Sequence, residues 1–208
     1  MFGIHDFGLF LAAAIALNLT PGPDTAYILG RSITQGRAAG IASALGISAG
    51  SIFHTTAAAL GLSAILASSA LAFGTIKLLG GAYLIFLGIK MILDRGRELS
   101  LRYNFRRRTI AAAFRQGIFT NVLNPKVGLF FLAFLPQFID PSCGMKVLAF
   151  LLLGFTFVTT GTIWCLIIAC FASAFSERLR TNETIGLWLS RAAGALFVFL
   201  GLRLARIK

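Results

Sequence analysis

Two short proline-containing segments carry the residues of this chain that are best suited to chemistry. One begins at Thr20 and the other at Asn121, and both lie inside long apolar runs. A proline inside a helix removes a backbone hydrogen bond and clashes with the preceding turn. Each segment is therefore predicted to break a helix and to free backbone polar groups, which protein, water or a ligand must satisfy. The residues that we assign to a binding site at these breaks are Thr20, Pro21, Gly22, Pro23, Asp24, Asn121, Asn124, Pro125 and Lys126.

These residue types suit a zwitterionic ligand such as an amino acid. The N-termini of half-helices carry partial positive charge and free N–H groups, which favour a carboxylate. Asp24 could bind an ammonium group or carry a proton. Lys126 could pair with Asp24 in an empty site, or with a carboxylate in an occupied one. The alternative is that both lie near a membrane interface, with Lys126 extending to water. Apolar residues flank both side chains, which favours the binding role.

Another candidate for proton transfer is His54. Gly46, Gly50 and His54 follow one another at intervals of four residues, so they share one face of a helix. Small residues at this spacing let a second helix approach closely. His54 would point into that interface, where an imidazole could carry a proton because it titrates near neutral pH. Packing is the commoner role for such a histidine.

The same segment matches the G-x-S-x-G pattern of serine hydrolases, with Ser48 in the place of the nucleophile. That chemistry needs a base within hydrogen-bonding reach of the serine. His54 is six residues further along the same helix, off the face of Ser48. We therefore interpret the glycines as a helix-packing stripe and expect a protein that is not an enzyme, with no catalytic residue, metal site or cofactor.

The elements that must position these residues are apolar helices. The chain has 208 residues, of which 57% are hydrophobic and 12% charged, and its mean hydropathy is +0.85. Soluble domains carry about 25% charged residues, and about 20 apolar residues suffice to span a bilayer. The composition predicts an all-α integral membrane protein with six transmembrane helices. The predicted spans are Phe7–Leu29, Ile41–Leu66, Leu71–Leu93, Thr109–Phe138, Val147–Phe175 and Ile185–Leu204.

The net charge of +12 does not indicate a nucleic-acid partner, because the basic residues lie mostly between the apolar segments. The linker 94–108 contains most of the arginines that precede the fourth span, and the positive-inside rule places it in the cytoplasm. The N-terminus then lies outside. So does the basic tail with Arg203, Arg206 and Lys208, against the rule.

The chain also repeats itself. Residues 81–90 match residues 194–203 in their glycines, their Phe-Leu-Gly run and their final cation. The proline-containing breaks form a second pair, in the first and fourth spans. An odd number of spans per repeat forces the two halves into opposite orientations, as in many secondary transporters. We expect one transporter domain over 1–208, made of inverted three-helix repeats at 1–93 and 109–208.

The segment from Leu19 to Asp24 closely resembles the LysE/RhtB family of bacterial amino-acid exporters. The resemblance continues through further segments that together cover nearly the whole chain. They are 36–41, 45–54, 59–62, 77–84, 124–126, 130–131 and 135–138.

This resemblance implies a six-helix carrier of the bacterial inner membrane that exports amino acids or close analogues, driven by the proton-motive force. Its partners would be the amino-acid substrate, protons and the lipid bilayer, and the protein would act as a monomer or a homo-oligomer. In the mechanism that we expect, the breaks meet near the midplane, the ammonium group binds Asp24, and a proton returns on Asp24. The alternative is an exporter of metal or other inorganic ions, which would need several intramembrane acids or soft ligands.

Overall fold

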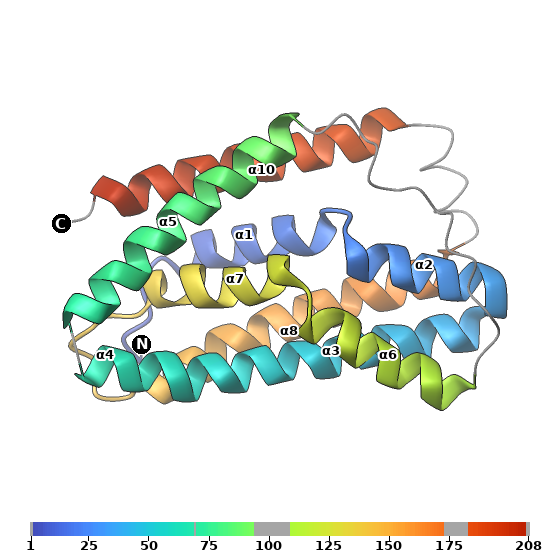
Figure 1. The fold of residues 1–208 in the computed structure, drawn as a ribbon, viewed down its shortest axis with the longest axis horizontal. Coiled ribbons are helices and arrows are strands. Elements are labelled where there is room, and N and C mark those ends of the chain that lie inside the picture. Colours follow the sequence, from blue (N-terminus) through green and yellow to red (C-terminus); the bar gives the residue numbers. More distant parts are fainter. Residues whose placement is uncertain (1, 69, 94–108, 173–182, 207–208) are drawn as a thin grey trace.

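The computed structural model describes residues 2–68, 70–93, 109–172 and 183–206, and these ranges contain helices and no strand. Figure 1 shows the helices lying roughly along one long axis. The α-helices are α1 (Phe7–Leu19), α2 (Pro23–Gln35), α3 (Arg37–Ala57), α4 (Ser63–Ser68), α5 (Ala70–Leu93), α6 (Ile110–Val122), α7 (Pro125–Phe134), α8 (Lys146–Cys170) and α10 (Glu183–Arg206). A π-helical segment, Ala58–Leu62, joins α3 to α4, and a 3₁₀ turn, Leu135–Phe138, follows α7.

Two helical stretches in the described residues are long and apolar enough to cross a membrane, namely Arg37–Ile65 and Lys146–Cys170. A third is added if Ile110–Val122 and Pro125–Phe138, which meet at a bend of 48°, are counted as one span. The described part of the chain is thus all-helical, as predicted, with helices suited to a bilayer. The arrangement of six spans stays a prediction, and the linker 94–108 lies outside the described residues.

The prolines interrupt both predicted helices at the expected places. In the first, Thr20 leaves the helical conformation, Gly22 is fully extended, and Pro23 is the first residue of α2. In the second, Asn124 caps α7 by accepting a hydrogen bond from the Lys126 backbone N–H at 3.0 Å. Proline suits the first position of a helix because its missing N–H would have no intrahelical partner there.

The first predicted span is wrong at its end. The helix after the break continues from Leu29 to Gln35 and stops at Gly36, whose φ of +89° is one that glycine adopts readily. Arg31, which lies after the predicted end of the first span, is therefore inside α2 and only 1% exposed.

The core has α3 against α6 and α8, with α5 packed along α10 on the other side of the molecule (Figure 1). Phenylalanines fill the space between α1, α7 and α8. Phe10 lies 5.4 Å from Phe138 and 6.2 Å from Phe134, measured between ring centroids, and Phe130 lies 5.1 Å from Phe157. This aromatic cluster connects α1, which precedes the first break, to α7, which follows the second break.

Glycines set the closest helix crossings, as the sequence predicted for α3. A Cβ added to Gly46 would meet the carbonyl of Phe114, and one added to Gly50 would lie 2.8 Å from Cβ of Asn121. The helices α3 and α6 therefore approach until their backbones touch, which brings the second break against α3.

The repeated segments also contact each other through glycines. A Cβ added to Gly88 would lie 2.5 Å from the carbonyl oxygen of Gly194, and one added to Gly194 would lie 2.6 Å from that of Gly88. At the other end of the crossing, Gly201 approaches the carbonyl oxygen of Gly81. In the sequence repeat Gly81 corresponds to Gly194, and Gly88 corresponds to Gly201. Each glycine of one repeat thus contacts the non-equivalent glycine of the other, which is the pattern of a two-fold contact.

Candidate functional site

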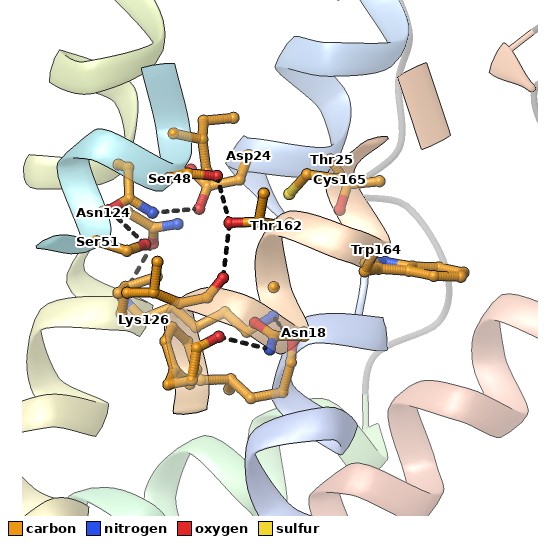
Figure 2. Close-up of a pocket in the computed structure, with 18 of the residues that line it drawn as sticks. Asn18, Asp24, Thr25, Ser48, Ser51, Asn124, Lys126, Thr162, Trp164 and Cys165 are labelled. Atoms are coloured by element: carbon orange, nitrogen blue, oxygen red, sulfur yellow. Dashed lines mark hydrogen bonds between the residues drawn. The ribbon is translucent and has the colours of Figure 1, made fainter. Parts of the chain in front are cut away.

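A pocket lies where the two helix breaks meet α3 and α8 (Figure 2). The predicted site residues that line it are Thr20, Gly22, Asp24, Asn121, Asn124 and Lys126. The three prolines of the prediction do not line it; they shape the breaks that bring these side chains together.

Asp24 is the second residue of α2, at the positive end of that half-helix. One carboxylate oxygen, Oδ2, accepts a hydrogen bond of 2.8 Å from Nδ2 of Asn121. The other, Oδ1, is buried and accepts no hydrogen bond from any residue that the structure describes. A buried acceptor without a donor is costly, and the side chain of Asn124 and the charge of Lys126 also act on this carboxylate.

Asn121 connects Asp24 to α3. It is 1% exposed, and its side-chain oxygen accepts a hydrogen bond of 3.2 Å from Ser51. Its backbone oxygen lies 3.1 Å from Nε2 of His54, whose ring stacks on Phe131 at 5.8 Å between centroids. His54 is thus connected to Asp24 through a single intervening residue, Asn121, although it does not itself line the pocket.

Lys126 binds the end of α1, and its charge also acts on the carboxylate of Asp24. Its ammonium nitrogen donates to the backbone carbonyls of Leu17 at 3.0 Å and of Thr20 at 2.9 Å. Leu17 lies in the last turn of α1, where its carbonyl also accepts the backbone N–H of Thr20 at 3.2 Å, and Thr20 caps the end of that helix. The charge of Lys126 is therefore used to stabilise the end of the first half-helix.

One wall of the pocket comes from α8, which the sequence reasoning missed. Thr162 donates to Ser48 at 2.8 Å (Figure 2). Asn18 donates to the hydroxyl of Thr160, also on α8, at 3.1 Å. The signal was the polar run 159–162 inside a long apolar segment, because polar residues at membrane depth usually face a cavity or another helix.

Ser48 lies in the pocket instead of only in a packing stripe. Its hydroxyl donates to the carbonyl of Ala44 at 3.0 Å and accepts from Thr162, whereas His54 is held on Asn121. The histidine is therefore not the base that a serine nucleophile requires.

Beyond the pocket, α2 is bound to α6 by two buried side chains. The hydroxyl of Tyr27 donates to the carbonyl of Ala113 at 2.8 Å. Arg31 donates to Gln116 at 2.7 Å and to Gln35, and its guanidinium carbon lies 5.5 Å from the centroid of the Tyr27 ring. These contacts join the half-helix after the first break to the half-helix before the second.

Comparisons with known proteins show the family of the chain. The sequence model of the LysE type translocator matches residues 15–207. A membrane protein of Vibrio cholerae is 31% identical, over 99% of this chain and 98% of the relative. The homoserine/homoserine lactone efflux protein of Salmonella typhimurium is 30% identical, over 94% of each chain. The leucine efflux protein of Klebsiella pneumoniae is 24% identical, over 100% of this chain and 98% of the relative.

No solved structure matches the chain. The family match covers nearly the whole length of the chain and includes both helix breaks and the α8 wall of the pocket. Proteins of this kind move solutes and are not enzymes, which confirms the classification made from the sequence. The chain is therefore a membrane transport protein that belongs to the LysE type translocator family.

Proposed function

We propose that this protein exports amino acids or close analogues across the bacterial inner membrane in exchange for protons. The observation that carries the proposal is the carboxylate of Asp24, which presents a buried oxygen without a partner to a polar pocket at a helix break. The efflux relatives support the substrate class, since they are named for the efflux of leucine and of homoserine or its lactone.

The pocket offers complementary groups for the two charges that all amino acids share. Oδ1 of Asp24 suits the ammonium group. The first N–H of α2 with a helical acceptor is that of Ala26, which bonds to Gly22 at 2.9 Å. The N–H groups of Asp24 and Thr25 precede it at the positive end of the half-helix, where they suit a carboxylate.

Asp24 is also the proposed proton carrier. A carboxylate that binds a cationic group and a proton at the same oxygen cannot hold both, and this competition couples their movements. His54 is the second candidate, because its contact with Asn121 connects it to the same carboxylate. Proton transfer between the two would pass beside Asn121.

Alternating access follows if the chain forms six spans in two inverted repeats, 1–93 and 109–208. The reciprocal contacts of Gly88 with Gly194 support that arrangement, as do the breaks at equivalent places. With the linker 94–108 in the cytoplasm, α2 and α6 form the inner half of the pathway. The bonds of Tyr27 and Arg31 to α6 would then keep the inner side closed.

The test is export from proteoliposomes that contain the purified protein and a mixture of amino acids. An opposing proton gradient should accelerate the loss of one or a few of them, and a protonophore should abolish that acceleration. Empty liposomes provide the control for leakage. Equal loss of every amino acid with and without the protein would refute the proposal.

A further inference from the structure

The pocket is nearly neutral outside its helix breaks. Among the described residues that line it, the charged side chains are Asp24 and Lys126. The ammonium group of Lys126 is held on the carbonyls of Leu17 and Thr20. A charged side chain of a substrate would therefore be buried without a dedicated counter-ion, which is expensive in a membrane protein. A substrate bound through Asp24 is expected to carry an uncharged side chain.

At the α8 wall, the hydroxyl groups of Ser48 and Thr162 are suited to accept a hydrogen bond from a ligand, but not to donate one. A hydroxyl group has one proton to donate and two lone pairs that accept. Ser48 directs its proton to the carbonyl of Ala44 at 3.0 Å. Thr162 lies 2.7 Å from the carbonyl of Val158 and 2.8 Å from Ser48, so its single proton is shared between these two acceptors. Both protons are used within the protein, and lone pairs remain for the pocket.

We propose that the Ser48–Thr162 pair accepts a hydrogen bond from a hydroxyl group on the substrate side chain, which makes Thr162 a specificity-determining residue for neutral, hydroxylated amino acids. The inference rests on the proposed function, because it assumes that Asp24 binds the ammonium group of the same molecule. The ammonium group, the donor that all amino acids share, is then already bound at the breaks. The hydroxyl group of the side chain is what distinguishes one substrate from another. Figure 2 shows the bond between Ser48 and Thr162 within the pocket.

The experiment compares threonine with valine, which have nearly the same shape and differ by one hydroxyl. Initial rates of export for each are measured in proteoliposomes with wild-type protein and with Thr162→Val. The wild type should prefer threonine, and Thr162→Val should lower the threonine-to-valine ratio about three- to tenfold, as expected for one neutral hydrogen bond. Thr162→Ser keeps the hydroxyl and should restore the preference.

Thr156→Val is the matched control. Thr156 is on the same helix and bonds to the carbonyl of Leu152 at 2.8 Å, outside the pocket. Its substitution should leave the ratio unchanged. An equal ratio in the wild type and Thr162→Val, or export of lysine or glutamate faster than threonine, would overturn this inference while the proposed function stands. A wild-type protein that exports no amino acid would overturn the proposed function as well.

Discussion

The ammonium nitrogen of Lys126 lies 2.9 Å from the carbonyl oxygen of Thr20, so the second residue of α7 binds the end of α1. A corresponding contact joins Asp24, the second residue of α2, to Asn121 near the end of α6. Thus α7, which begins at the second break, binds the end of α1 at the first break. In the same way α2, which begins at the first break, binds α6 near its end at the second break. The two interruptions are therefore coupled directly.

Replacing Lys126 should loosen this coupling. Lys126→Met removes the ammonium donor from the carbonyls of Leu17 and Thr20, at a cost of about 2 kcal/mol or more for bonds that involve a charge. The expected result is a lower midpoint of thermal unfolding in detergent. Lys146→Met, at the start of α8, is the control and should unfold like the wild type. Equal midpoints for Lys126→Met and the wild type would show that the two bonds contribute nothing to stability.

Asp24 should be required for coupling to protons. In Asp24→Asn the side chain keeps its size but can neither release a proton nor neutralise an ammonium group. Export should fall at least about tenfold, as one lost charged contact predicts, and the remaining rate should not respond to the proton gradient. Asp140→Asn, in the exposed loop before α8, is the matched control. Export by Asp24→Asn that still follows the gradient would assign the proton to another group, with His54 first.

The crossing of α3 and α6 should not tolerate a methyl group. In Gly46→Ala the new Cβ would meet the carbonyl of Phe114, and the helices would have to separate at a cost of about 1–3 kcal/mol. Gly8→Ala is the control, because nothing lies within 4 Å of a Cβ at that position of α1. Thermal unfolding should distinguish the two variants. A stable Gly46→Ala protein would mean that this contact is not close-packed in the membrane.

The hydroxyl of Tyr27 should slow the separation of α2 from α6. Tyr27→Phe removes its bond to Ala113 and keeps the ring under Arg31, so the expected loss is about 1 kcal/mol. Hydrogen exchange of the backbone amides of α6 should become faster, and those of α10 provide an internal reference. Unchanged hydrogen exchange in α6 would show that this hydrogen bond does not limit the opening of the inner half.

The loop after the second broken helix offers a test outside the membrane. Hydrogen bonds from the hydroxyl and the backbone N–H of Ser142 hold the pKa of Asp140 below its ordinary value. A lowered pKa in the folded state means that these bonds contribute above the unfolded pKa and are lost as the pH falls through the folded one. Ser142→Ala should raise the pKa of Asp140, measured by NMR titration of its carboxyl carbon. An unaltered titration would show that the backbone bond suffices.

Local chemistry made the helix breaks predictable. Prolines at residues 21, 23 and 125 cannot occupy the interior of a regular helix, whatever the surrounding fold. The asparagine and aspartate beside them are caps or ligands by type, and they do meet in the pocket. The glycine spacing from Gly46 to Gly50 likewise predicted a close helix contact, because that periodicity belongs to the helix itself.

The sequence by itself determined an all-helical membrane protein with two interrupted helices, because hydropathy and proline act within one segment. Only the tertiary structure decided what those segments face. It placed the ammonium group of Lys126 on the end of α1, buried Arg31 against α6, and added Ser48 and Thr162 to the pocket. These outcomes depend on which helices become neighbours, and a side chain's partner across a helix interface is not encoded in its own segment.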